Sequence, residues 1–289
     1  MTDTSGLSAG LRARVALEKH GFRNAHALGQ NFLLDEGLLN ALLDAAALAP
    51  ADEVLEIGPG AGVMTALMAR RCKRVLAVEL DRNLEPVLDQ VLAGLENVRV
   101  AYQDFMKADL EALVGEGPYR VVANLPYYIT ADILLRLVTA RRRPQSICIM
   151  VQREAAERVM SRPGSKSWCA LAAMVQYYGA PSVLMDVPPE AFTPPPHVMS
   201  QFIRIDRHAR PEAEPRDEAV FFRLIAAAFA MRRKTLANNL KASFGMDQDT
   251  ARAVLEAAGV DPRVRGEALT LKALCRMSDI ISEKQGPAR

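Results

Sequence analysis

The chain has 289 residues, 50% of them hydrophobic and 24% charged, with a net charge of +2 and a mean hydropathy of +0.01. This is the composition of a folded globular protein, so it excludes a disordered chain, a collagen and a disulfide scaffold. The length suffices for about two domains. Residues 1–206 carry 21 Lys+Arg against 23 Asp+Glu, a net of −2, whereas residues 207–289 carry 15 against 11, a net of +4. A basic C-terminal part fits a polyanionic partner.

The cysteines and the apolar runs narrow the class of protein further. Cys72, Cys148, Cys169 and Cys275 form no C-x-x-C motif and have no His at ligand spacing, so we expect no metal site. No apolar run approaches the roughly 18 residues of a membrane helix. The first 14 residues are polar and lack the apolar segment of a secretory signal. We therefore expect a cytoplasmic protein with no membrane partner.

Short apolar runs alternate with helical patterns through the first 206 residues. A polar or helical arm at 1–20 and a Leu- and Ala-rich helix at 38–48 come first. The predicted strands are 53–57, 74–78, 98–102, 119–123, 147–151, 183–187 and 202–205, with helices at 63–71, 84–95 and 133–138. Strands that alternate with helices predict an α/β fold with a mostly parallel seven-stranded sheet. The last two strands have no helix between them, so we expect them to form an antiparallel hairpin at one edge.

The C-terminal part has a different pattern. Residues 206–217 contain two prolines and mixed charges, and we interpret them as a linker. Helical patterns follow without any strand pattern, at 219–233, 235–243, 249–258 and 270–283. We therefore expect two domains, an α/β domain at 1–206 and a small all-α domain at 207–289.

A glycine-rich run, Glu-Ile-Gly-Pro-Gly-Ala-Gly at 56–62, follows the first strand of the predicted sheet and opens a helix. The dinucleotide fingerprint G-x-G-x-x-G would place its third glycine at position 63, which is Val63. The spacing of Gly58, Gly60 and Gly62, after an acidic residue in the strand, instead favours S-adenosylmethionine. That ligand has no pyrophosphate to bind at a helix N-terminus. NAD remains the alternative.

Acidic residues follow the next two predicted strands. Glu79 stands 21 residues after Gly58, where a carboxylate can accept hydrogen bonds from the two hydroxyls of a ribose. Asp104 stands where it can accept a hydrogen bond from an adenine amino group. Each could instead be a helix N-cap or a solvated loop charge. Because three strand ends in order meet at one sheet edge, they predict a cofactor crevice there.

The fourth predicted strand ends in the turn Asn124-Leu125-Pro126-Tyr127-Tyr128. This pattern is typical of enzymes that methylate the amino group of a planar base, whose lone pair is delocalised into the ring. The Asn124 Oδ1 atom and the backbone carbonyl of Leu125 or Pro126 can accept hydrogen bonds from both N–H groups, and Tyr127 can stack on the base. Catalysis would then be mainly orientation. The alternative is an ordinary strand-to-helix turn with a buried tyrosine.

Over nearly its whole length the chain resembles the KsgA family of small-subunit ribosomal RNA adenine dimethyltransferases. The resemblance implies a Rossmann-like class I methyltransferase fold that uses S-adenosylmethionine and no metal. It is carried by Leu28-Gly29-Gln30-Asn31-Phe32-Leu33, Glu56-Ile57-Gly58-Pro59-Gly60, Glu79, Gln103-Asp104, Asn124-Leu125-Pro126-Tyr127, Phe192-Thr193-Pro194 and Arg232-Arg233-Lys234-Thr235-Leu236.

The resemblance also implies roles for individual residues. Phe192 would be a second stacking aromatic opposite Tyr127; a loop anchor next to three prolines is the alternative. The implied cofactor residues are Gln30, Asn31, Leu33, Gly58, Gly60, Glu79, Asp104 and Asn124, and the implied catalytic residues are Asn124, Leu125, Pro126, Tyr127 and Phe192. The chain departs from the family pattern at Met199, where an acidic residue is usual, and at Trp168-Cys169, where Tyr-Gly is common. None of these positions belongs to the implied cofactor site.

A basic run lies at 229–241, with four positive charges and no acidic residue. A helix over this run would bury its apolar residues Phe229, Leu236 and Leu240 and present the charges to RNA phosphates. A solvated helix face is the commoner explanation of such a run, but the family resemblance favours RNA binding. Arg141-Arg142-Arg143 is a second basic cluster, for which we favour neither explanation. The implied RNA-binding residues are Arg232, Arg233, Lys234 and Lys241.

The resemblance implies dimethylation of the N6 atoms of two adjacent adenines near the 3′ end of 16S ribosomal RNA. The implied partner is small-subunit ribosomal RNA or a 30S subunit precursor, with a role in small-subunit biogenesis. One alternative is a large-subunit adenine methyltransferase of the macrolide-resistance type. Another is a non-catalytic RNA-binding assembly or transcription factor. We expect a monomer, since the sequence shows no exposed apolar stripe.

Overall fold

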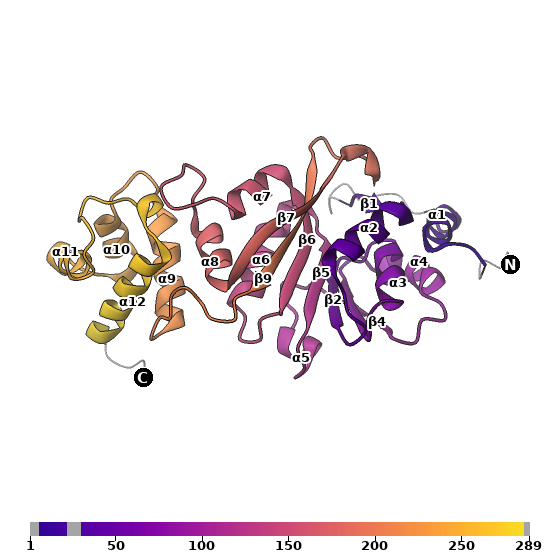
Figure 1. The fold of residues 1–289 in the computed structure, drawn as a ribbon, viewed down its shortest axis with the longest axis horizontal. Helices are drawn as coiled ribbons and strands as arrows, with labels where there is room; N and C mark the ends of the chain where they lie inside the picture. Colours follow the sequence, from indigo (N-terminus) through magenta and orange to yellow (C-terminus); the bar gives the residue numbers. More distant parts are fainter. Residues whose placement is uncertain (1–5, 22–29, 286–289) are drawn as a thin grey trace. The chain divides into compact units, whose positions relative to one another are not determined.

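The computed structural model describes residues 6–21 and 30–285, and the chain divides into two compact units (Figure 1). The first unit combines residues 1–156 with 182–206, and the second combines 157–181 with 207–289. The expected division at 206/207 is one of these boundaries, but residues 157–181, expected in the first domain, group with the second unit. No helix in the described ranges is long and apolar enough to cross a bilayer.

A seven-stranded sheet has the order β4-β3-β2-β5-β6-β9-β7. Its strands are β2 (Glu53–Ile57), β3 (Arg74–Glu79), β4 (Val98–Tyr102), β5 (Arg120–Asn124), β6 (Ser146–Gln152), β7 (Gly179–Val187) and β9 (Ser200–Arg207). The pairs β2–β3, β3–β4, β2–β5 and β5–β6 are parallel, and β9 is antiparallel to β6. The predicted mostly parallel Rossmann-like sheet is confirmed. Because the strand order reverses beside β2, a crevice opens at its carboxyl end.

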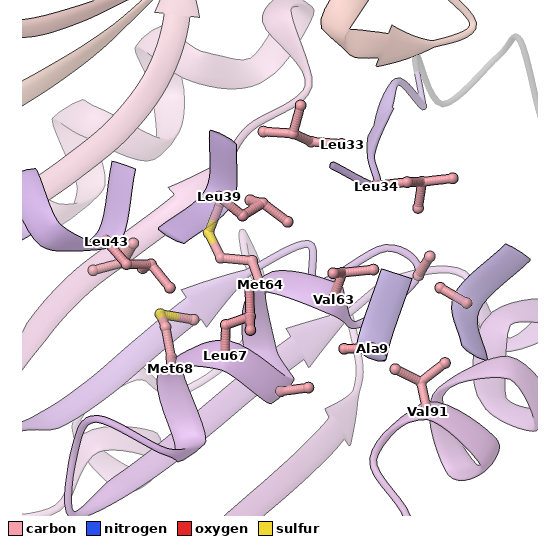
Figure 2. Packing of buried hydrophobic residues seen from close by; sticks show 14 of the residues in the cluster. Ala9, Leu33, Leu34, Leu39, Leu43, Val63, Met64, Leu67, Met68 and Val91 are labelled. Carbon is pink, nitrogen blue, oxygen red and sulfur yellow. The ribbon is translucent and has the colours of Figure 1, made fainter. Parts of the chain in front are cut away.

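In the described part of the chain, seven α-helices precede or follow the strands of this sheet up to residue 159. They are α1 (Ala9–Lys19), α2 (Glu36–Ala46), α3 (Val63–Ala69), α4 (Glu85–Val91), α5 (Leu110–Val114), α6 (Thr130–Thr139) and α7 (Arg153–Val159). Figure 2 shows Leu39 and Leu43 of α2 facing Met64, Leu67 and Met68 of α3. Each of these five side chains is buried, so the interface stabilises the position of α3 and of the loop that precedes it.

A two-residue strand pair joins distant parts of the first unit. β1 (Phe32–Leu33) lies antiparallel to β8 (Phe192–Thr193), with Leu33 opposite Phe192. Both strands are too short to leave a periodic pattern in the sequence, so neither was predicted. The pair fixes the segment that follows residue 29 against the loop that precedes β9.

The second unit contains α8 (Ala170–Tyr178), α9 (Glu218–Ala230), α10 (Leu236–Phe244), α11 (Gln248–Ala257) and α12 (Leu271–Gln285). Residues 157–181 belong to it because α8 packs on α9, where the Tyr177 ring lies 4.9 Å from the Phe221 ring, between centroids. The expected helix through the basic run is wrong in one respect. α9 ends at Ala230 and α10 begins at Leu236, so Arg232, Arg233 and Lys234 lie in the turn between them.

Trp168, one of the departures from the family pattern, is part of the core of the second unit. Its side chain is fully buried, and its indole Nε1–H donates to the Leu269 carbonyl at 3.1 Å. Its ring meets Phe229 edge-on at 6.4 Å. The neighbouring Cys169 is the N-cap residue of α8. The Trp168-Cys169 pair is therefore accommodated by packing.

We expect Trp168→Ala to lower the free energy of unfolding by about 3–5 kcal/mol, because it leaves a cavity the size of an indole. Trp168→Phe keeps most of the ring and loses the bond to Leu269, which costs about 1–2 kcal/mol. Equilibrium urea unfolding followed by far-ultraviolet circular dichroism measures both. Met231→Ala, at an exposed position of the same unit, is the control and should change stability by less than about 0.5 kcal/mol. Equal stability of the three variants would contradict the assignment of Trp168 to the core.

Candidate active site

One cavity opens at the carboxyl ends of β2, β3, β4 and β5 in the first unit. Its volume is about 1100 Å³ when the space at its open mouth is included. It brings together all of the sequence-predicted cofactor residues and most of the predicted catalytic ones. Those lining it are Gln30, Asn31, Leu33, Gly58, Gly60, Glu79, Asp104, Asn124, Leu125, Pro126 and Tyr127. Leu28 and Gly29 of the family motif lie outside the described residues.

The glycine loop forms part of the cavity wall. Gly60 has a φ of +57°, and a Cβ there would lie 3.0 Å from the Phe32 Cδ1 atom. Gly62 has a φ of +77°, and its Cβ would lie 2.8 Å from the Leu88 Cδ2 atom. Both positions therefore require glycine, for the backbone conformation and for the space. Gly58 and Gly60 of this loop line the cavity, so the backbone itself faces the space where a ligand would bind.

Glu79 is buried at the end of β3 and joins two segments of the site. Its Oε2 atom accepts from the Gly60 backbone N–H at 3.2 Å, and its Oε1 atom accepts from the Asp81 N–H at 2.8 Å. Burial raises the pKa of the Glu79 carboxyl, while the N–H groups of Asp81 and Gly60 lower it. The Gln30 side chain donates to Asp81 Oδ2 at 3.0 Å, which draws the segment before β1 to the same place.

Glu56 is a site residue whose role the sequence interpretation did not specify. It is 1% exposed, lines the cavity, and accepts from the Thr65 hydroxyl at 2.5 Å. Burial raises the pKa of Glu56 to about 8, with the Thr65 hydrogen bond lowering it and the nearby Glu79 raising it. The carboxyl is therefore an uncharged or readily protonated group beneath the glycine loop near neutral pH.

Asp104 lies at the cavity and also shapes its own loop. Its Oδ1 atom accepts from the Met106 N–H at 2.9 Å, and Lys107 Nζ lies 3.4 Å from its Oδ2 atom. The Arg136 guanidinium of α6 donates to the carbonyls of Phe105 and Ala108 and lies over the Phe105 ring. The turn-forming and the ligand-facing explanations of Asp104 therefore both fit the structure.

The turn after β5 holds its polar groups in defined orientations. The Asn124 amide nitrogen donates to the Asn31 carbonyl at 3.1 Å, so the Oδ1 atom is the acceptor that the side chain presents. The Pro126 carbonyl accepts from the Thr130 hydroxyl at 3.1 Å and from the Ile129 N–H at 3.3 Å. Of the two backbone acceptors left open by the sequence, the one at Leu125 is therefore the better available.

The two predicted stacking aromatics differ in position. Tyr127 is half-buried at the cavity, and its hydroxyl lies 2.5 Å from Ser200 Oγ on β9. Phe192 is 3% exposed, packs in the hydrophobic core, and is not among the cavity-lining residues. Its backbone pairs with Leu33, which does line the cavity. In this structure Phe192 therefore contacts the site through Leu33.

Leu80 was missed by the sequence interpretation. It lines the cavity directly after Glu79 and is 51% exposed. A solvent-exposed leucine after a strand-end carboxylate offers a flat apolar surface to an aromatic ring. The available signal was its place in the chain, because the residue after a strand-end acid must lie at the same edge.

The predicted RNA-binding residues belong to the second unit and are not among the residues that line the cavity. Arg233, Lys234 and Lys241 are exposed, whereas the Arg232 guanidinium donates to the Lys166 carbonyl at 2.5 Å and lies 3.9 Å from Glu267. In the first unit, Arg142 of the other basic cluster donates to the Gly117 carbonyl at 3.1 Å. Arg232 and Arg142 thus have structural contacts.

The described ranges contain no group of three or more His, Cys, Asp and Glu side chains arranged to hold a metal ion.

Met199 is the remaining departure from the family pattern. Its backbone carbonyl accepts a hydrogen bond from the Arg153 N–H at 3.0 Å. It is not among the residues that line the cavity.

The model of one protein family matches most of the chain. The family is described as "Ribosomal RNA adenine dimethylase", and the match covers residues 21–283. A ribosomal RNA small subunit methyltransferase A from Geobacillus thermodenitrificans is 40% identical over 93% of this chain and 95% of its own. The protein of the same name from Pelotomaculum thermopropionicum is 41% identical over 94% and 96%.

Two solved structures of methyl-transferring enzymes have the same fold. A dimethyladenosine transferase from Plasmodium falciparum has a TM-score of 0.70 and 21% identity, covering 84% of this chain and 94% of its own. The 23S rRNA methyltransferase ErmE has a TM-score of 0.63 and 26% identity, covering 86% and 98%. The likeness to the first concerns the fold alone.

The raised pKa of Glu56 predicts a stability that falls with pH. The folded carboxyl, with a pKa of about 8, holds its proton more tightly than the unfolded one, at 4.5. The stability it contributes is complete below pH 4.5 and is lost as pH rises to 8. Between pH 4.5 and 8 the free energy of unfolding of the wild type should therefore fall relative to that of Glu56→Gln, by up to about 1.4 kcal/mol per pH unit.

Urea unfolding at several pH values between 5 and 8 measures this difference. Glu53→Gln is the control, because the hydrogen bond from Lys73 lowers the pKa of Glu53 and keeps it ionised throughout the window. Its difference from the wild type should not vary with pH. A Glu56→Gln difference that is equally constant would show that Glu56 ionises normally in the folded protein.

Proposed function

The chain belongs to the ribosomal RNA adenine dimethylase family, and from that membership we propose that it dimethylates the N6 atoms of two adjacent adenines near the 3′ end of small-subunit ribosomal RNA. Relatives named ribosomal RNA small subunit methyltransferase A, at about 40% identity over more than nine-tenths of the chain, support the small subunit as its target. The observation that carries the proposal is the oriented Asn124 amide, which lines the same cavity as the buried Glu79.

The cavity residues fit S-adenosylmethionine. The Glu79 carboxylate retains lone pairs for the ribose hydroxyls beyond the two N–H groups that it accepts. Leu80 would offer an apolar face to the adenine, and Asp104, on the same cavity lining, would accept from the adenine amino group. When bound, this cofactor supplies an electrophilic methyl group on a sulfonium. The chain itself contributes binding, through the glycine loop, and orientation.

The target amine needs two acceptors, and the turn after β5 provides them. We assign these to Asn124 Oδ1 and the Leu125 carbonyl, since the Pro126 carbonyl already accepts two hydrogen bonds. Accepting from both N–H groups favours a pyramidal nitrogen, whose lone pair is then directed away from the ring. Because the Asn31 carbonyl holds the Asn124 amide in one orientation, this arrangement exists before the base arrives. Preorganised acceptors of this kind act without reorganisation during the reaction.

The aromatic residues would hold the base. Tyr127 offers its ring to the target adenine, with its position fixed by Ser200. The stacking role of Phe192 stays a prediction, and its burial in the core means that the side chain would have to move to reach the base. Phe192→Leu separates the two roles, since it keeps an apolar side chain and removes the ring.

We assign RNA phosphate contacts to the second unit. Arg233, Lys234 and Lys241 are exposed and free of acidic neighbours in the sequence run, as phosphate contacts that position RNA without reading its sequence require. Arg232 serves mainly to brace the turn against Lys166 and Glu267.

We further propose a monomer that acts in the cytoplasm, where the small subunit is assembled.

The alternatives are less well supported. The large-subunit enzyme ErmE shares the fold at 26% identity, well below the identity of the small-subunit relatives. A non-catalytic RNA-binding role would leave the complete set of Glu79, Asn124, Leu125 and Tyr127 at the cavity unexplained. Neither alternative is favoured by any feature of the site.

Methyl transfer to small subunits from a strain that lacks this modification tests the proposal. Tritiated S-adenosylmethionine supplies the label, and nucleoside analysis of the digested RNA should identify N6,N6-dimethyladenosine. We expect Asn124→Ala to lower the turnover rate by about 10²–10³-fold, the typical cost of removing one preorganised polar group. Cofactor affinity should change much less, because we assign the Asn124 oxygen to the target amine and the other implied cofactor residues are unchanged.

The matched control is Asn40→Ala. Asn40 lies on α2, its amide oxygen accepts from the Arg71 guanidinium, and it is not among the residues that line the cavity. Its turnover should stay within about twofold of the wild type, since Asn40 has no partner at the site. Incorporation into large subunits instead, or a wild type that binds the cofactor and transfers nothing, would overturn the proposal. A fully active Asn124→Ala variant would overturn the role of the amide alone.

A further inference from the structure

Tyr128 is the most exposed large apolar side chain in the described part of the chain, with 61% of its surface accessible. It lines the cavity, directly after Tyr127. The other large apolar side chains with high exposure are Leu11, Leu80, Val183, Val198 and Met231. Of this set, Leu80 and Tyr128 are the two that line the cavity. Exposed apolar surface at the mouth of a binding cavity is typical of ligand contact.

The local helix directs the two tyrosines to different places. Tyr127 and Tyr128 belong to the 3₁₀ segment η3 (Tyr127–Ile129), in which successive side chains are about 120° apart. The Tyr127 hydroxyl is held by Ser200 on β9, and this side chain is half-buried. Tyr128 therefore projects in another direction, in agreement with its exposure.

The backbone beneath Tyr128 is anchored at both ends. The Ile129 N–H and the Thr130 hydroxyl both donate to the Pro126 carbonyl, and α6 continues from Thr130. Ile129 and Ile133 form part of the same cavity wall. The ring is thus carried on a short braced segment, which limits the entropy lost when a flat ligand stacks on it.

We propose that Tyr128 is a stacking platform for the nucleotide next to the adenine that occupies the cavity. This inference rests on the proposed function. An adenine that is drawn out of its stack leaves the neighbouring base with an uncovered face. A tyrosine at the mouth covers that face at the point where the strand must leave the cavity. The occupant is a base of the same RNA because the platform is continuous with the wall that receives the target.

Stacking is tolerant of sequence, since every base has a flat π face. The neighbouring nucleotide differs between the first and the second target adenine. One stacking platform can therefore serve both. This property suits an enzyme that modifies two adjacent adenines in a single cavity. Tyr127 and Tyr128 would then divide the work, one holding the target base and the other its neighbour.

The test compares Tyr128→Phe, Tyr128→Leu and Tyr128→Ala in methyl transfer to unmodified small subunits. Loss of a stacked base corresponds to roughly 5- to 150-fold in affinity, so kcat/KM for subunits should fall by at least about fivefold in Tyr128→Ala. Tyr128→Phe, which keeps the ring, should stay within about twofold of the wild type. Tyr128→Leu should lie between them. S-adenosylmethionine affinity, measured by isothermal titration, should not change.

Leu11→Ala is the matched control, at a side chain 46% exposed on α1 and away from the cavity, and it should behave as the wild type. The inference is overturned if the wild type is active and Tyr128→Ala is equally active, or if Tyr128→Phe is as poor as Tyr128→Ala. It is also overturned if cofactor affinity falls in parallel, since the ring would then belong to the cofactor site. A wild type that transfers no methyl group to subunits overturns the proposed function, and this inference with it.

Discussion

The buried carboxylate of Glu79 is the contact on which the geometry of the site depends. It accepts the backbone N–H groups of Gly60 and Asp81, so it connects the end of β3 to the glycine loop after β2. Through Asp81 it also connects to Gln30, and Asn31, next in the chain, accepts from Asn124 at the end of β5. The proposed cofactor and base sites are thus joined by hydrogen bonds through the segment that contains Gln30 and Asn31.

Burying that carboxylate has a cost, seen in its raised pKa. Backbone N–H groups offset the cost in part, and they can do so only because the loop has glycine where a side chain would collide with Phe32. Glu56 has only the Thr65 hydroxyl as its hydrogen-bond donor within the described ranges, and burial raises its pKa to about 8. Burial therefore raises the pKa of both carboxyls, and the negative charge of Glu79 contributes to the shift at Glu56.

Much of this site could be predicted from the chain because parallel topology determines where strand ends meet. Once β2 to β5 are recognised, Gly58, Glu79, Asp104 and Asn124 must lie at one edge. The β1–β8 pair and the burial of Phe192 could not be predicted, since a two-residue strand leaves no periodic signal. The helix expected over 229–241 is interrupted because Met231 and Thr235 leave the helical backbone conformation, and α10 begins only after its N-cap residue Thr235.

The difference in net charge between the two folded units is larger than the difference between residues 1–206 and 207–289. Residues 157–181 add three basic residues and one acidic residue to the C-terminal part. Its net charge rises from +4 to +6, and that of the first unit falls from −2 to −4. An acidic unit suits a cationic cofactor, and a basic unit suits RNA phosphates.

Isothermal titration of S-adenosylmethionine into the wild type and Glu79→Gln tests the central claim most directly. In Glu79→Gln, the side-chain NH2 group replaces one of the two acceptor oxygens, so it faces the N–H of Gly60 or Asp81 and cannot accept from it. The substitution also removes the negative charge proposed to bind the ribose hydroxyls. A charged hydrogen bond contributes about 1.5–3 kcal/mol, so we predict that the dissociation constant rises by at least tenfold. An affinity within twofold of the wild type would contradict the account.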